Sequence, residues 1–236
     1  MNKKVVLLCG ASGSGKSYSL KRLVQEHGDK LAIIDTDGKG MLPFKGKKKV
    51  AKWITPSDPL EVNPGVRVLE ENPDIEYIVI DSGSHWLRAL EQKYITNSAD
   101  SRSAWGRIYS EELQNLIHFA THESKKHWIF IWHTMEGEIR NGRIPIQAFV
   151  KGGLKNVSIE SFFQVVIYTD VAECDECEEG IKYRFQVRKT KDTRDMSIKT
   201  PEGLFESPYT ESNDILEVFE AIDKYEEEWT PSWVWR

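Results

Sequence analysis

A glycine-rich loop at residues 10–17, GASGSGKS, is the sequence feature that most restricts the fold of this 236-residue chain. It has the spacing G-x-x-x-x-G-K-S and follows the apolar run VVLLC at residues 5–9. The residues after it carry Leu20, Leu23 and Val24 on one side of an expected helix. A strand, this loop and a helix in that order are typical of a P-loop domain that binds a nucleoside triphosphate.

Each part of the loop has an expected contact with the nucleotide. Gly10, Gly13 and Gly15 allow the backbone to curl, so that successive N–H groups face an anion. Lys16 is expected to reach the β- and γ-phosphates, and Ser17 is expected to hold Mg²⁺. The candidate nucleotide-binding residues are Gly10, Ala11, Ser12, Gly13, Ser14, Gly15, Lys16, Ser17 and Tyr18.

Four further apolar runs predict strands of the same sheet: residues 31–35, 77–81, 127–132 and 162–169. They lack inside-outside alternation and are separated by helical stretches, notably residues 104–123, which indicates a parallel sheet covered on both faces. Residues 183–191 and 196–201 are more polar and predict exposed strands. We therefore predict an α/β fold with a mainly parallel twisted sheet, flanking helices and a C-terminal antiparallel extension.

The length and the distribution of charge predict one large domain followed by a short acidic segment. A chain of this length with 39% hydrophobic residues fits one sizeable domain, which we place at residues 1–210. Residues 211–228 hold eight acids and one base, so the remainder carries about +2 of the net −5. We expect residues 211–236 to form an acidic helix and a Trp-rich tail with Trp229, Trp233 and Trp235, either packed on the core or docked onto a partner or a neighbouring subunit.

The apolar runs indicate where in the cell the protein is located, and the cysteines are interpreted with that location in mind. No run approaches the roughly 20 residues of a membrane span, and the N-terminus lacks a secretory signal, so we expect a cytoplasmic protein with no membrane partner. Cys9 is expected to be buried in the first strand. Cys174 and Cys177 are interpreted as a reduced hairpin tip, because a zinc site would need two further ligands from a neighbour or a distant histidine.

Acidic residues end two of the predicted strands. Asp81 follows the apolar run 77–80 and is the candidate that holds Mg²⁺ through water, on a strand expected next to the P-loop strand. Asp35 and Asp37 end another strand, where a carboxylate could orient the attacking water. The carboxyl ends of the strands are where such sheets bind ligands.

In this order the motifs resemble the RecA-like ATPase core, and within it the bacteriophage-encoded RecA-like proteins that include single-strand annealing proteins. The resemblance covers most of residues 3–200 and rests on the P-loop followed by IDTDG, VIDS, IFIWHT, GGLKN and VRKTK at residues 34–38, 79–82, 129–134, 152–156 and 187–191. It implies a Mg²⁺-dependent ATPase acting on single-stranded DNA in phage-type recombination or replication, slow without DNA or oligomerisation. It further implies a homo-oligomer, action beside a single-stranded-DNA-binding protein, and the cytoplasm of a host cell.

The resemblance also implies roles for individual residues. Asp37 would activate water, although RecA itself has Glu there. His133 would sense the γ-phosphate and relay to a DNA-binding loop, or is simply a hydrogen-bonded residue at a strand end. Lys189 and Lys191 match a K-x-K pair that reaches the γ-phosphate of a neighbouring subunit, or are solvated lysines. Polymerisation would use a surface other than a segment before the core, or would be absent, because the first strand starts near Lys3.

DNA contacts are expected in two loops, residues 85–105 and 135–155. The second mixes basic residues, glycines and an aromatic residue, which suits tracking of a nucleic-acid backbone, although an ordinary surface loop has the same composition. Its candidate DNA-binding residues are Arg140, Arg143, Phe149, Lys151 and Lys155.

Two other functions remain open at this point. The chain could be a nucleotide-gated assembly or binding protein without a DNA role, which recruits a partner through its Trp-rich tail. It could also be a small-molecule P-loop kinase, with RNGR at residues 140–143 in place of an Arg-rich lid. No Ser-His-Asp order or G-x-S-x-G motif supports ester hydrolysis.

Overall fold

The computed structural model describes residues 3–96, 98–139, 142 and 144–228. Its strands are β1 (Val5–Gly10), β2 (Leu31–Asp35), β3 (Lys52–Ile54), β4 (Tyr77–Asp81), β5 (His127–Glu136), β6 (Ile146–Ala148), β7 (Val165–Glu173) and β8 (Ile181–Gln186). Its α-helices are α1 (Lys21–His27), α2 (Val62–Glu71), α3 (Gly83–Leu90), α4 (Ser101–Arg107), α5 (Gln114–His118) and α6 (Ile215–Glu228).

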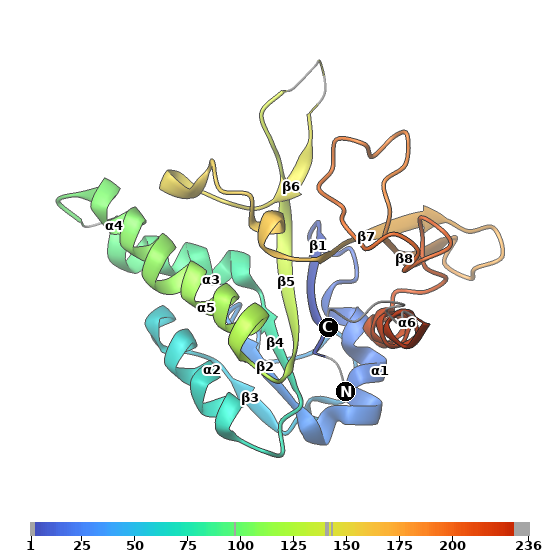
Figure 1. Cartoon of the computed structure of the whole chain (residues 1–236), viewed down its shortest axis with the longest axis horizontal. Helices are drawn as coiled ribbons and strands as arrows, with labels where there is room; N and C mark the ends of the chain where they lie inside the picture. The colour runs from blue at the N-terminus through green and yellow to red at the C-terminus, as the bar shows by residue number, and fades with distance from the viewer. Residues whose placement is uncertain (1–2, 97, 140–141, 143, 229–236) are drawn as a thin grey trace, which may run out of the picture.

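The strands form one mixed sheet in the order β3-β2-β4-β5-β1-β7-β8, with β6 paired to the end of β5 (Figure 1). The pairs from β3 through to β7 are parallel. The β7–β8 and β5–β6 pairs are antiparallel. The prediction of a mainly parallel α/β sheet with a C-terminal antiparallel extension is confirmed.

One feature of the predicted strand order is wrong. The strand that ends in Asp81 is not adjacent to the P-loop strand, because β5 lies between β4 and β1. Phe130 on β5 is paired with Leu7 on one side and with Ile80 on the other. The apolar run of β5 is as buried as its neighbours, so nothing in the local pattern reveals which strand is central.

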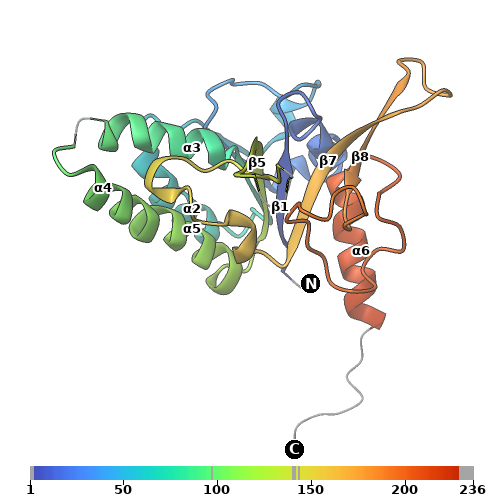
Figure 2. The same ribbon diagram turned by 90° about the horizontal axis from the view of Figure 1, so that it is seen from above.

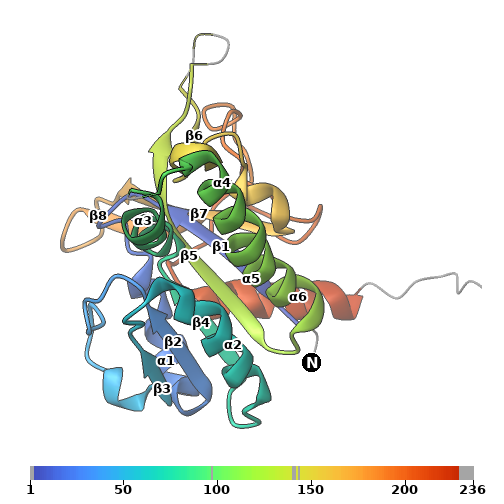
Figure 3. The same ribbon diagram turned by 90° about the vertical axis from the view of Figure 1, so that its left-hand side faces the viewer.

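Two helical layers bury the two faces of the sheet (Figure 2). Leu7 and Cys9 of β1 face the layer of α2, α3, α4 and α5, whereas Val6 and Leu8 face α1 and α6. Figure 3 views the molecule from the side on which α4 and α5 lie in front of the sheet. Burial on both faces explains why the strands read as continuous apolar runs.

The long helical prediction at residues 104–123 is confirmed, and the helical run begins earlier, at Ser101. Its N-cap is Asp100, whose side chain accepts a hydrogen bond from the Ser103 amide at 3.0 Å. The turns that follow α4 and α5, Ile108–Leu113 and Phe119–Glu123, are π-helical.

The polar strands expected near the C-terminus are shorter than predicted. β8 ends at Gln186, whose side-chain amide donates to the Arg188 carbonyl oxygen at 3.2 Å and so turns the chain. The second expected strand is reduced to a single bridge between Lys199 and Val166. The expected acidic helix is present as α6, and its residues Ile215 and Phe219 are buried against the sheet. Trp229, Trp233 and Trp235 lie outside the described residues.

Among the helices in the described ranges, none has the length and hydropathy that crossing a membrane requires.

A buried histidine at the start of β5 should make stability depend on pH. The imidazole of His127 accepts a hydrogen bond at Nδ1 from the Lys4 amide at 3.1 Å, and burial lowers its pKa to about 4. The unfolded chain therefore binds a proton near pH 6.5 that the folded chain does not, so stability falls as pH falls below 6.5. We expect His127 to remove roughly 2 kcal/mol between pH 7 and pH 5.

Urea unfolding of the wild type and of His127→Asn at the two pH values measures this contribution. Asn keeps an acceptor but does not titrate, so the variant should lose less stability than the wild type on acidification. Equal losses in the two proteins would contradict the assignment.

Candidate nucleotide-binding site

The P-loop joins β1 to a helical turn, Ser17–Leu20, that is 3-10 rather than α-helix. Gly13 and Gly15 have φ values of 75° and 90°, in the region that favours glycine. The side chain of Asn213, just before α6, donates from Nδ2 to the Gly15 carbonyl oxygen at 2.9 Å. The loop is therefore shaped by its glycines and held by the C-terminal part of the chain, a contact that no sequence motif indicates.

The Lys16 side chain folds back along the inside of the loop. Its Nζ donates to the carbonyl oxygens of Gly10 at 3.0 Å and of Ala11 at 2.6 Å. Burial lowers the pKa of Lys16 to about 8, and the nearby Asp81 carboxylate partly opposes this effect. An ammonium group held by loop carbonyls can exchange them for phosphate oxygens.

Ser17 and Asp81 meet although they lie on separate elements. The Ser17 hydroxyl donates to Asp81 Oδ2 at 2.7 Å. Burial raises the pKa of Asp81 to about 6, while the hydrogen bond from Ser17 acts in the opposite direction. Hydroxyl and carboxylate oxygens are ligands that suit Mg²⁺, so the expected metal-binding pair is brought together.

These residues border one cavity of about 480 Å³ at the carboxyl edge of the sheet. Its lining residues are Ser12, Gly13, Gly15, Lys16, Ser17, Tyr18, Asp37, Lys39, Pro43, Asp81, His133, Glu179 and Tyr183. Glu179 and Tyr183 come from the β7–β8 hairpin, which sequence reasoning does not connect with the nucleotide. The cavity is thus bounded by the P-loop, three strand ends and the C-terminal extension.

Asp37 lies just beyond β2 with its side chain only 3% exposed. Its Oδ2 pairs with Lys39 Nζ at 2.5 Å, and its Oδ1 contacts His85 Nδ1. Sequence reasoning misses both partners in this role, although Lys39 directly follows IDTDG and His85 follows VIDS by three residues. A buried carboxylate at this edge is placed to accept a hydrogen bond from a water molecule in the cavity.

His133 on β5 is paired with Gly10, the first residue of the P-loop. Its backbone N–H donates to Ser84 Oγ at 2.7 Å, and its ring meets the ring of His85 edge to face at a centroid distance of 5.1 Å. Burial, together with the nearby Lys16 ammonium, lowers the pKa of His133 to about 4. The imidazole is therefore neutral at physiological pH and lines the cavity as a hydrogen-bonding group.

The chain matches the model of one protein family over most of its length. A family model described as an AAA domain matches residues 2–201. The chain belongs to this AAA domain family. The prediction of a P-loop ATPase domain is confirmed at that level, whereas the finer resemblance to bacteriophage-encoded RecA-like proteins stays a prediction.

Solved structures resemble the AAA domain at low sequence identity. One is the crystal structure of a KaiC-like protein from the hyperthermophilic archaeon Pyrococcus horikoshii OT3, with 17% identity, 81% coverage of each chain and a TM-score of 0.47. A comparison with curated protein sequences found no match.

The K-x-K pair of the AAA domain lies away from its own cavity. Lys189 and Lys191 are exposed and follow the end of β8. Neither is among the described residues that line the nucleotide cavity. Their expected role toward a neighbouring subunit stays a prediction.

Of the candidate DNA-binding residues, Phe149, Lys151 and Lys155 lie within the described ranges. Arg140 and Arg143 lie outside the described residues. The ring of Phe149 packs under the Arg88 guanidinium at 4.5 Å, and Lys151 Nζ pairs with Glu91 at 2.8 Å. Lys155 is exposed.

Part of the candidate DNA-binding stretch is paired with the sheet or buried in the core. β6 pairs with β5, and Leu154 in the turn after β6 is buried. Within the described part of this stretch, Ala148, Val150 and Leu154 belong to the core.

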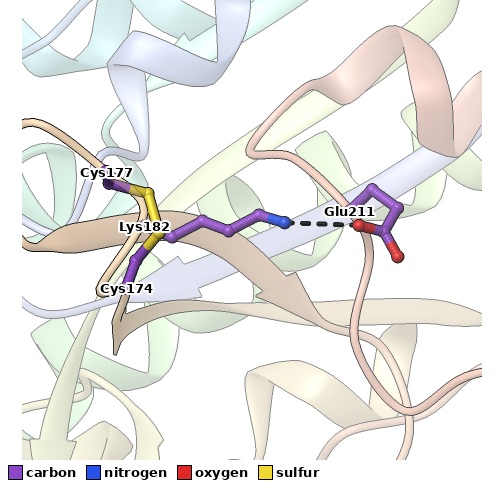
Figure 4. Close-up of a disulfide and its surroundings, with 4 residues drawn as sticks. All are labelled: Cys174, Cys177, Lys182 and Glu211. Atoms are coloured by element: carbon purple, nitrogen blue, oxygen red, sulfur yellow. Dashed lines mark hydrogen bonds and ion pairs between the residues drawn. A yellow bond between two sulfur atoms is a disulfide. The ribbon is translucent and has the colours of Figure 1, made fainter.

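Cys174 and Cys177 form a disulfide across the turn between β7 and β8, with their Cα atoms 5.3 Å apart (Figure 4). The interpretation of a reduced pair is therefore wrong in this structure. The turn brings the two residues within disulfide reach, since the Cys177 amide donates to the Cys174 carbonyl oxygen at 3.2 Å. Bonded sulfurs are not thiolate ligands, so the pair does not form a zinc site in this state. Beyond it, Lys182 pairs with Glu211 at 3.2 Å.

Close packing at Gly10 should make the AAA domain intolerant of any side chain there. A Cβ at Gly10 would lie 1.9 Å from Thr169 Oγ1 and 2.6 Å from Ser14 Oγ, so both hydroxyls would have to turn away and their mutual hydrogen bond, 2.6 Å long, would break. We expect Gly10→Ala to weaken nucleotide binding at least tenfold, as measured by fluorescent-nucleotide titration.

The matched control is Gly65→Ala in α2, where a Cβ meets nothing within 4 Å. This variant should bind nucleotide normally and gain about 0.5–1 kcal/mol of stability. Normal binding by Gly10→Ala would show that the loop does not depend on this contact.

Proposed function

We propose that this chain is a Mg²⁺-dependent ATPase of the RecA-like type that acts on single-stranded DNA. The observation that carries the ATPase part is the convergence of Lys16, the Ser17–Asp81 pair and Asp37 on one cavity. Charge stabilisation and an oriented water are the main requirements of phosphoryl transfer, and these groups match them.

The side chains at this site have the chemistry that a nucleotide and a divalent cation require. The ammonium of Lys16 is held on the cavity side of a loop whose backbone curls around an anion site. Ser17 and Asp81 would hold Mg²⁺, which when bound neutralises charge on the phosphate oxygens. The preference for ATP rests on the family resemblance.

Asp37 and His133 are proposed to act at the γ-phosphate end. Asp37 would orient the attacking water through its buried carboxylate, and His133 would offer a neutral ring N–H toward the phosphate. Two hydrogen bonds, one between backbone groups and one from a side chain, connect β5 to the candidate DNA segment. The Phe149 amide donates to the His133 carbonyl oxygen at 2.7 Å, and Trp132 Nε1 donates to the Phe149 carbonyl oxygen at 2.7 Å.

These contacts support a relay between nucleotide and DNA. A shift of His133 on γ-phosphate binding would move the backbone at Phe149 directly. Arg88 beside Phe149 and the exposed Lys155 supply positive charge for a phosphate backbone, and Lys151 would add to it on exchanging Glu91 for a phosphate. A single-stranded-DNA-binding protein remains part of the proposal through the family resemblance alone.

A DNA-assembled ATPase should show turnover that depends on protein concentration. We expect single-stranded DNA to stimulate ATP hydrolysis steeply as protein concentration rises, because assembly completes the site. Lys16→Ala should abolish turnover. Lys125 is exposed and lies just before β5, so Lys125→Ala should leave turnover unchanged.

A flat response to DNA at all concentrations would favour a nucleotide-gated binding protein instead. ATP hydrolysis retained by Lys16→Ala would contradict the ATPase proposal itself. A small-molecule kinase would instead transfer phosphate to an acceptor, with little release of free phosphate.

The proposed oligomer predicts complementation between two inactive variants. Lys16→Ala lacks its own nucleotide site, and the double variant Lys189→Ala/Lys191→Ala keeps that site but cannot serve a neighbour. If the lysines act across a subunit boundary, mixing the two proteins with DNA should restore part of the wild-type turnover. No recovery in the mixture, with both variants folded, would place the lysines outside the reaction.

A further inference from the structure

Asp37 lies in a cluster with two histidines, His85 and His133, which orienting a water molecule does not require. One carboxylate oxygen of Asp37 and one ring nitrogen from each of His85 and His133 lie within 4.8 Å of one another. Asp37 follows β2, His133 lies on β5, and His85 lies in the first turn of α3. Two imidazoles and one carboxylate on three separate elements form the donor set of three-ligand transition-metal sites.

The two oxygens of Asp37 have different surroundings. Oδ2 pairs with the exposed side chain of Lys39 at 2.5 Å. Oδ1 is buried and accepts no hydrogen bond from any residue in the described ranges, although it contacts His85 Nδ1. Within this cluster Asp37 Oδ1 therefore meets imidazole alone, and a cation bound between the carboxylate and the two rings would satisfy the oxygen.

The supporting residues hold the ligands in place. His85 Nδ1 lies 2.9 Å from Ser82 Oγ, and the His133 backbone is fixed by the Ser84 hydroxyl at 2.7 Å. Ser82 and Ser84 are fully buried at the start of α3. Hydrogen-bonded partners of this kind orient histidine ligands in metal sites.

We propose that Asp37, His85 and His133 form a binding site for a divalent transition-metal ion of the Zn²⁺ class, separate from the Mg²⁺ pair Ser17 and Asp81. Imidazole nitrogens select zinc and its neighbours, whereas Mg²⁺ prefers oxygen ligands. Tetrahedral coordination at about 2.0 Å places ligand atoms about 3.3 Å apart, so the three atoms close in by about 1.5 Å at most. Asp37 and His133 line the cavity, so a fourth position would open toward it for water or a phosphate oxygen.

Cobalt binding to the full chain, without nucleotide and without Mg²⁺, tests the proposal. Co²⁺ replaces Zn²⁺ in such sites and has visible absorption that reports its coordination. We expect one Co²⁺ per chain, displaced by an equivalent of Zn²⁺ and not by excess Mg²⁺. His85→Ala and His133→Ala, made separately, should each weaken Co²⁺ binding on the order of 100-fold or more, beyond the effect of losing an outer-shell partner.

Two controls exclude the other candidate ligands. His118 and His122 stack on the exposed face of the α5 region at a centroid distance of 4.5 Å, so His118→Ala/His122→Ala removes a matched histidine pair from the surface. Cys174→Ser/Cys177→Ser removes the sulfurs that reduction would free. Both controls should bind Co²⁺ as the wild type does, and urea unfolding should show that all variants fold.

Absence of Co²⁺ uptake by the wild type would overturn the proposal. So would uptake that survives in His85→Ala and disappears in either control. Because this assay uses no nucleotide, its failure leaves the proposed Mg²⁺-dependent ATPase untouched, and loss of ATPase activity would not decide the metal site.

Discussion

The candidate site depends on the parallel alignment of β2, β4, β5 and β1. In a parallel sheet the carboxyl ends of the strands share one edge. Asp35 is paired with Asp81, and Gly10 is paired with His133, so groups distant in sequence meet there. Helices bury both faces of this sheet, and a slip of one residue would exchange the side chains of the two cores. The same packing that stabilises the fold therefore fixes the positions of the catalytic candidates.

Burial also sets the electrostatics of the cavity. It lowers the pKa of Lys16 to about 8 and raises that of Asp81 to about 6, so each shift opposes the charged form. A phosphate beside Lys16 and a cation beside Asp81 favour the charged forms again. Buried Lys16 and Asp81 are therefore complementary to a metal–triphosphate complex, which brings a negative phosphate to Lys16 and a positive metal ion to Asp81.

Much of this site is predictable because its signals are local. The P-loop spacing identifies Lys16 and Ser17, and an apolar run ending in an acid identifies Asp81. Strand order is not local, so the position of β5 between β1 and β4 is missed. His85 is missed for a related reason: its partner Asp37 belongs to another strand end, and no spacing along the chain links them.

The hydrogen bond from Asn213 to Gly15 joins positions 198 residues apart. During synthesis the P-loop leaves the ribosome before Asn213 does, because it lies earlier in the sequence. The loop that binds phosphate therefore gains this support only after β7, β8 and the segment before α6 have been made and folded against it. Nascent chains that stop short of Asn213 would carry a complete P-loop sequence without this hydrogen bond.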